Sequence, residues 1–385
     1  MSSITRTVWI LSLVSLFTDM ASDMLYPVLP SYLSSIGFSI AVIGLLEGVA
    51  EATAGLSKGY FGHLSDLSGK RLPFVRMGYA LSAISKPLMA IFPQVLWIFG
   101  ARTLDRLGKG MRSGARDAML ADESEKSERG TVFGFHRSMD TVGAALGPML
   151  ALVWLYFRPG DYIPLFFIAF VPGLVSVVLL FIMREKPVSD RPPQKQVKFF
   201  EGWKNSPAQY KWLILGLGIF ALLNSSDIFL LLRAKQSGLA DSEVVGLYIF
   251  YNLVFALFAY PLGRLSDKIG LKRIFISGLF VFVLVYALMS LGLQGWMFYL
   301  LFLLYGIYAA ATEGLAKAWI SKVCAPDQKA TAIGTYAGIQ SVCALFASSW
   351  AGFLWQWQGF GAMFASTALL VAVLILFFVF KLREP

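Results

Sequence analysis

The feature that most constrains the fold of this chain is a series of long apolar runs separated by short polar segments. Two of these runs are FIAFVPGLVSVVLLFIM and STALLVAVLILFFVF. A helix needs about 20 mainly apolar residues to cross the ~30 Å hydrocarbon layer of a bilayer. Only 15% of the residues are charged and 57% are hydrophobic, a balance that is not typical of a soluble domain. The sequence therefore predicts an all-α polytopic membrane protein, since helices satisfy their own backbone hydrogen bonds in lipid.

The apolar runs predict about twelve transmembrane helices, with centres near residues 20, 51, 83, 106, 141, 172, 222, 252, 283, 307, 342 and 371. The first run follows Arg6, but no small-residue cleavage site comes after it, so we interpret it as a permanent span and not as a signal peptide. The segment 184–210 is polar, basic and rich in proline. We interpret it as a cytoplasmic linker between an N-terminal six-helix bundle at 1–183 and a C-terminal six-helix bundle at 211–385. Within it, FFEGWKN fits a short surface helix and a disordered tether equally well.

The distribution of positive charge indicates a membrane partner and no nucleic-acid partner. The net charge is +10, and most lysines and arginines fall in alternate loops or near the C-terminus, as in Lys70-Arg71 and Lys272-Arg273. This is the positive-inside pattern of membrane proteins. It predicts a multi-pass membrane protein with both termini cytoplasmic. We expect this membrane to be a bacterial-type cytoplasmic (inner) membrane, and we expect the protein to be a monomer.

Two polar stretches of the chain read almost alike. They are GHLSDLSGKR, beginning at Gly62, and GRLSDKIGLKR, beginning at Gly263, and shorter echoes such as ASDM at Ala21 and SSDI at Ser225 agree with them. Two repeats of six helices with parallel topology are typical of secondary transporters, whose halves rock about a midplane site. The glycine after each LSD sequence is expected to allow a tight turn. We expect a gating role for Gly62, Asp66, Gly69, Arg71, Gly263, Asp267, Gly270 and Arg273.

With these motifs the whole chain resembles the major facilitator superfamily. The stretch from Gly62 to Arg71 is similar to that family's cytoplasmic signature between helices 2 and 3, and the stretch from Gly263 to Arg273 is similar to its second-half copy. The resemblance implies alternating-access transport of a small molecule.

Two further motifs resemble those of the drug/proton antiporter branch of the family. The helix 5 motif of that branch is matched by four residues, although Ala151 and Leu152 stand where it usually has glycines. Its helix 4 motif is matched by Arg106 and Gly110, with Lys109 in place of the usual glutamine. This resemblance implies efflux coupled to proton entry. The residues that match the helix 5 motif are Gly134, Gly143, Gly147 and Pro148.

Ionisable residues inside the predicted spans are concentrated in the first half. A charge at the bilayer centre costs ~3 kcal/mol or more, so such residues face a partner or a wet cavity. Asp19 and Asp23 lie one turn apart in the first helix, and two close carboxylates in a poorly hydrated cavity cannot both stay ionised at low cost. We expect proton coupling at Asp23, with Asp19 and the second-half echo Asp227. The expected substrate contacts are Asp19, Arg102, Asp105, Arg106, Asn224, Asp227 and Tyr305.

Other charged residues of the spans allow two interpretations. Arg112 and Arg116 are expected to reach the cytoplasmic interface by snorkelling. Glu313 and Lys317 are spaced i, i+4 in the favourable order and fit a simple ion pair. For four residues, a structural ion pair and a functional role are equally compatible with the sequence: Glu47, Glu51, Lys86 and Asp140.

Enzyme motifs do not fit this chain. The G-x-S-x-G sequence at 55–59 lies inside a predicted span and not on a strand-to-helix turn. Neither H-E-x-x-H nor G-x-x-x-x-G-K-[ST] occurs. We therefore expect no enzymatic activity, no cofactor and no metal, and an ion gradient as the energy source. A proton suits the many carboxylates, and sodium is the alternative.

Three functions remain open at this point. The favoured one is proton-coupled efflux of a small organic molecule. The second is proton-coupled uptake of an anionic or chelated solute, which the basic stripe of the fourth span favours. The third is a membrane sensor or scaffold of transporter shape that moves no solute.

Overall fold

The computed structural model describes residues 4–123, 129–183, 207–324 and 329–382. The segment FFEGWKN, for which a surface helix and a tether were both expected, lies outside these ranges. The described part of the chain is helical and contains no strand. The helices of the first half are α1 (Arg6–Leu25), α2 (Leu29–Ser35), α3 (Ile40–Ser68), α4 (Leu72–Ile91), α5 (Val95–Asp122), α6 (Arg129–Phe157) and α7 (Ile163–Phe181). Those of the second half are α9 (Ala208–Leu223), α10 (Ile228–Gln236), α11 (Asp241–Ile269), α12 (Leu271–Met289), α13 (Met297–Val323) and α14 (Lys329–Lys381).

These helices make twelve spans, six in each half of the sequence, as predicted. The first span of each half is broken: α1 and α2 together form one, and α9 and α10 form the other. The last helix, α14, contains two spans, because Gly359 interrupts it with a non-helical backbone (φ 86°). The continuous apolar run predicts one unbroken helix for the first span. The helix is instead broken at residues 26–28, where Pro27 lies, and Pro30 is the second residue of α2.

The chain divides into two compact units. The first takes in Met1–Phe38, Val49–Pro192 and Ala240–Val245, and the second takes in the remainder. The predicted bundle boundaries at 183 and 211 remain predictions, because 184–206 lies outside the described residues.

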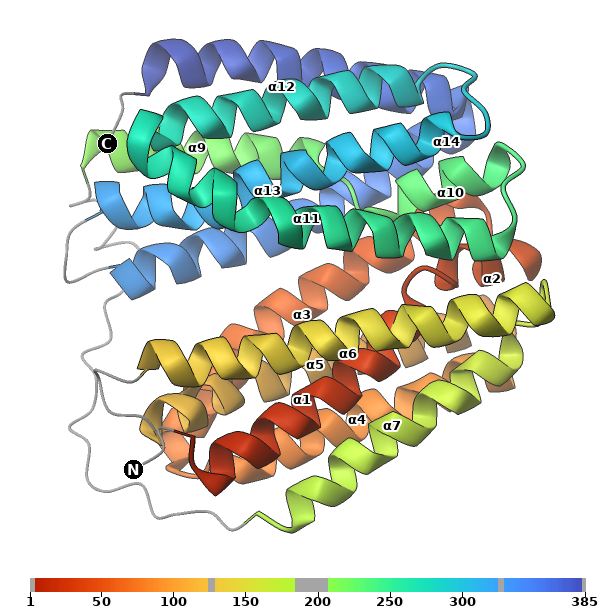
Figure 1. Cartoon of the computed structure of the whole chain (residues 1–385), viewed down its shortest axis with the longest axis vertical. Helices are drawn as coiled ribbons and strands as arrows, with labels where there is room; N and C mark the ends of the chain where they lie inside the picture. The colour runs from red at the N-terminus through yellow and green to blue at the C-terminus, as the bar shows by residue number, and fades with distance from the viewer. Residues whose placement is uncertain (1–3, 124–128, 184–206, 325–328, 383–385) are drawn as a thin grey trace. The chain divides into compact units, whose positions relative to one another are not determined.

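The same helix pairs pack together in each unit. In the first unit α1 packs against α6 and α7, and α4 packs against α5 and α7. In the second unit α9 packs against α14, and α12 packs against α13 and α14. Figure 1 shows α1 running along α6, and α12 running along the later part of α14. Since α14 holds the counterparts of both α6 and α7, the repeat seen in the sequence is also a repeat of packing.

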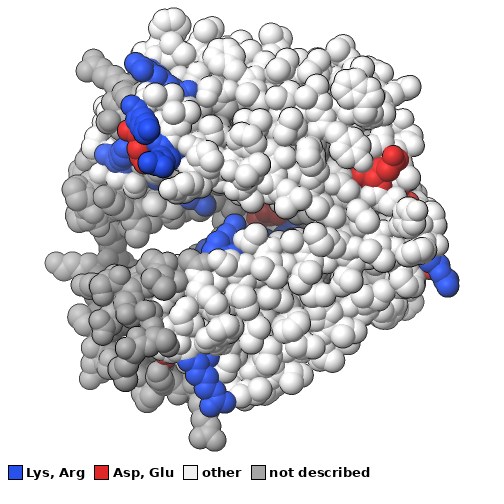
Figure 2. Space-filling view, in the orientation of Figure 1, with Lys and Arg blue, Asp and Glu red and all other residues white. Residues whose placement is uncertain are grey.

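The surface of the helices is suited to lipid. Large apolar side chains such as Phe157, Phe181, Leu257 and Phe380 are more than two-thirds exposed. Figure 2 shows a wide face with almost no charged side chain, and lysines and arginines near the left end of the view, where α11 ends and α12 begins. Nine stretches of the described chain are long and apolar enough to cross a membrane, and the last of them holds both spans of α14. The helices α4 and α5 are not among these stretches, although they pack inside the first unit.

The turns after the two LSD sequences have the predicted geometry. Gly69 and Gly270 both have positive φ values, 64° and 108°. Residues other than glycine rarely adopt this backbone conformation. In the same two stretches Ser65 and Ser266 are buried, and each hydroxyl donates to the carbonyl three residues earlier. The two copies therefore share local structure as well as sequence.

The helix 5 motif forms a close contact between two helices. A Cβ added at Gly143 would meet the backbone of Leu16, and one added at Gly147 would meet the backbone of Met20 and Met24. Small residues allow two backbones to approach in this way within a membrane. These two glycines of the motif therefore allow α1 and α6 to pack closely.

We expect Gly147→Leu to destabilise the protein, because the added side chain has no space between α6 and α1. Overpacking of this kind costs typically ~1–3 kcal/mol. Thermal unfolding of the purified protein in detergent measures the effect. Gly100→Leu is the matched control, since a Cβ at Gly100 meets nothing within 4 Å. Equal unfolding temperatures for the two variants would contradict the prediction.

Candidate functional site

The two carboxylates of α1 stand apart from the ion pairs around them. Asp19 and Asp23 are half-buried, and neither forms a hydrogen bond or ion pair with any described residue. Lys109 and Arg106 of α5 and Lys86 of α4 are the cations that act electrostatically on Asp23. Two carboxylates one turn apart, free of fixed partners and close to cations, can exchange a proton without breaking a structural contact.

A buried ion cluster joins three helices of the first unit. The Lys86 ammonium donates to Asp105 Oδ1 over 2.6 Å and to Ser22 Oγ of α1 over 3.2 Å. Ser82 Oγ also donates to Asp105 Oδ1, over 2.7 Å, and Arg102 Nη1 lies 3.4 Å from Asp105 Oδ2. Every charged member is buried. This cluster fixes α1, α4 and α5 beside one another, so Lys86, Arg102 and Asp105 have partners that a substrate would have to displace.

The remaining cations of α5 have different surroundings. Arg106 Nη2 lies 3.4 Å from Glu51 Oε1 of α3, and Arg106 is buried while the Glu51 side chain is 42% exposed. Lys109 is exposed, and its ammonium has no hydrogen bond or ion pair within the described ranges. Arg112 is buried with its guanidinium 4.5 Å from the centre of the Tyr79 ring. The prediction that Arg112 snorkels to the interface is therefore wrong, because an aromatic face inside the unit holds it.

Polar contacts between α1 and α6 continue toward the N-terminal ends of both helices. Ser12 Oγ and His136 Nδ1 are 3.3 Å apart, and His136 Nε2 lies 3.6 Å from Asp140 Oδ1. Arg116 Nη1 of α5 donates to Ser15 Oγ over 2.9 Å. Both His136 and Asp140 are buried, so Asp140 is part of a polar contact inside the unit.

In the second unit the predicted site residues meet at the break between α9 and α10. Tyr305 Oη of α13 donates to Asp227 Oδ1 over 2.6 Å, and Asn224 Nδ2 donates to Tyr308 Oη over 3.2 Å. Asp227 therefore differs from its echo Asp23: a buried tyrosine already donates to it.

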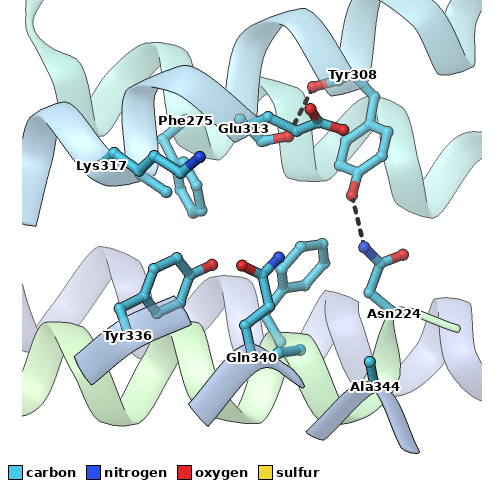
Figure 3. A pocket seen from close by; sticks show the side chains of 12 residues that line it. Asn224, Phe275, Tyr308, Glu313, Lys317, Tyr336, Gln340 and Ala344 are labelled. Atoms are coloured by element: carbon cyan, nitrogen blue, oxygen red, sulfur yellow. Dashed lines mark hydrogen bonds between the residues drawn. The ribbon is translucent and has the colours of Figure 1, made fainter. Parts of the chain in front are cut away.

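Asn224 and Tyr308 also line a pocket of about 270 Å³ within the second unit. Its walls come from α9, α12, α13 and α14. Figure 3 shows Lys317 on one side and Tyr336 and Gln340 on the other, with their polar ends pointing into the space between α13 and α14. The pocket is lined by Phe220, Ala221, Asn224, Phe275, Tyr308, Thr312, Glu313, Ala316, Lys317, Tyr336, Gln340 and Ala344.

The predicted gating residues lie at helix ends. Arg71 forms an ion pair with Asp122 at the end of α5. Asp267 and Arg273 are exposed, and the side chain of Asp66 lies outside the described residues. Gly62 and Gly263 lie in the last two turns of α3 and α11, and Gly134 lies in the second turn of α6. Their gating role stays a prediction.

Sequence reasoning missed several members of these groups. Ser22 and Ser82 hold Lys86 and Asp105, but a serine in a span carries no signal of its partner. Tyr336 was also missed, although it precedes Gln340 by four residues, a spacing that places both on one helix face. Among the described residues, no group of three His, Cys, Asp or Glu side chains is placed to hold a metal ion.

A helical membrane protein with twelve spans in two similar halves, and with charged groups inside the spans, has the architecture of a membrane transporter. The family model of the Major Facilitator Superfamily matches residues 11–250 and 231–385. The chain therefore belongs to the major facilitator superfamily.

Known relatives cover nearly the whole chain. An uncharacterised MFS-type transporter of Methanocaldococcus jannaschii, MJ1317, is 34% identical over 92% of this chain and 89% of its own length. A multi-drug resistance efflux pump PmrA homolog of Lactococcus lactis is 22% identical over 98% of this chain and 95% of its own. The crystal structure of the nucleoside transporter NupG matches with a TM-score of 0.80 and 14% identity, covering 98% of this chain and all of that one. At that identity the likeness to NupG shows the fold alone.

Proposed function

We propose that this chain is a secondary active transporter that exports a small organic molecule in exchange for protons. The observation that carries the proposal is the pair Asp19 and Asp23, which are half-buried and have no hydrogen bond or ion pair with any residue that the structure describes. Similarity to an efflux pump over almost the whole length of this chain supports export. The architecture supports movement of the solute by alternating access.

In this mechanism Asp23 takes up and releases the coupling proton, with Asp19 and Asp227 as the associated carboxylates. Two ionised carboxylates one turn apart repel each other, and protonation of one of them relieves that repulsion. A cationic group of the substrate that pairs with Asp19 removes the repulsion between the two carboxylates and therefore favours release of the proton from Asp23. An anionic group at Arg106 has the opposite effect and favours retention of the proton. Proton release and substrate binding thus become linked without a second energy source.

A second candidate is uptake of an anionic solute together with protons. The exposed Lys109 on the basic stripe of α5 favours it, because its ammonium has no anionic partner in the described chain. Under this alternative the solute's anionic group binds Lys109 or Arg106, and the proton still binds Asp23.

Reconstituted vesicles with an imposed pH gradient test both candidates. A ligand-stability screen of the purified protein first selects compounds that raise its unfolding temperature. Export predicts that a selected compound moves against the proton flow, and uptake by symport predicts movement with it. Absence of any gradient-driven flux would contradict both transport candidates, and a non-transporting sensor or scaffold would then be the remaining function.

A further inference from the structure

The pocket of the second unit contains a cation that the proposed proton chemistry does not use. Lys317 lies on α13, and its ammonium points into the space between α13 and α14 (Figure 3). The i, i+4 spacing predicted an ion pair with Glu313, but no described residue hydrogen bonds or ion pairs with Lys317. Charges within spans face an opposite charge or a wet cavity. Here the cation faces a cavity.

Four aromatic side chains contribute to the walls of this pocket, beside polar residues and alanines. Phe220, Phe275, Tyr308 and Tyr336 come from four different helices. Phe275 is fully buried and is fixed by the rings of Trp319 and Phe378, whose centres lie 5.7 and 5.3 Å from its own. Rigid rings of this kind pack against a flat ligand with little loss of side-chain entropy.

The two ends of the pocket differ in charge. Lys317 lies near Tyr336 and Gln340, whereas Glu313 lies nearer Tyr308 (Figure 3). A carboxylate accepts hydrogen bonds only, so the Glu313 end favours a hydrogen-bond donor and repels a second anion. The volume of about 270 Å³ is just below the ~300–1,000 Å³ typical of ligand pockets, which favours a ligand with a single ring.

We propose that this pocket binds a small aromatic carboxylate that carries a hydroxyl or amino group at the opposite end of its ring. The carboxylate lies against the Lys317 ammonium, the ring lies among the four aromatic side chains, and the donor group points toward Glu313. This inference rests on the proposed function only for the statement that the bound molecule is transported. Binding itself requires only the pocket.

Titration calorimetry on the full-length protein in detergent tests the site, with 4-aminobenzoate as the probe. We expect saturable binding that falls at least tenfold in Lys317→Gln and is retained in Lys317→Arg, which keeps the charge. Lys322→Gln is the matched control, because Lys322 lies on the last turn of the same helix and is exposed. Size-exclusion profiles show whether each variant is folded.

Two analogues separate the parts of the proposal. Aniline keeps the ring and lacks the carboxylate, while cyclohexanecarboxylate keeps the charge and lacks the aromatic faces. Each is expected to bind at least tenfold more weakly than 4-aminobenzoate. The proposal is overturned if either analogue binds as well, if folded Lys317→Gln binds normally, or if 4-aminobenzoate does not bind. None of these results depends on flux in vesicles, so failure of the site and failure of the transport proposal are distinguishable.

Discussion

Replacing Asp23 by Asn should abolish proton-driven transport while the protein still folds and binds substrate. The asparagine keeps the size of the side chain and removes its ability to carry a proton. Since Asp23 has no hydrogen bond or ion pair among the described residues, the change breaks no structural contact. We expect gradient-driven accumulation in vesicles to fall to the background of empty vesicles. Exchange of labelled for unlabelled substrate without a gradient should continue.

The control for this variant is Asp161→Asn, which removes a carboxylate outside the helices, between α6 and α7. It should transport as the unmodified protein does. Normal accumulation by Asp23→Asn would show that another group carries the proton. Asp19, Glu47 and Glu51 would then be tested in the same way.

Replacing Lys86 by Met should be strongly destabilising, because it leaves Asp105 buried without its closest cation. Removal of one partner of a buried ion pair costs ~3–5 kcal/mol. The Lys86–Asp105 side chains are 2% and 6% exposed, and the distance between their charged atoms is 2.6 Å. We expect a large drop in the thermal unfolding temperature in detergent and low yield of folded protein.

Lys58→Met is the matched control for this second prediction. Lys58 pairs with Asp117 at 3.4 Å, but those side chains are 54% and 37% exposed, and exposed pairs contribute only ~0–1 kcal/mol. Adding Asp105→Asn to Lys86→Met should recover part of the lost stability, since the uncompensated carboxylate is then gone. If Lys86→Met unfolds at the same temperature as Lys58→Met, the buried cluster does not have the role that its geometry indicates.

Much of the fold follows from patterns that repeat along the chain. Long apolar runs predict the spans. The glycine after each LSD sequence predicts a tight turn, which is found as the positive φ of Gly69 and Gly270, because such a turn depends on local backbone conformation and not on a distant partner. The break between α9 and α10, which contains Asp227, is harder to predict. No proline lies between α9 and α10, and only the echo of ASDM in SSDI relates this region to the first span.

The site is less predictable because it depends on which side chains meet. The positions of Asp19 and Asp23 on one helix face follow from their spacing, but the absence of a partner for them among the described residues does not. Equally, the spacing of Glu313 and Lys317 predicts an ion pair, whereas the Lys317 side chain points into a pocket. Its rotamer depends on the space that α14 leaves, and that space is a property of tertiary packing.

The low hydropathy of α4 and α5 has a consequence for how the protein is made. Each charged residue at the centre of a helix adds ~2.5–3.5 kcal/mol to the free energy of insertion by the translocon, and α5 carries Arg102, Asp105, Arg106 and Lys109. Neither helix is apolar enough to enter lipid by itself, and the carboxylate of Asp105 has its closest cation on α4. Biosynthesis should therefore hold the two helices at the translocon until they can enter the bilayer as a pair, so that the ion pair forms before either helix meets lipid.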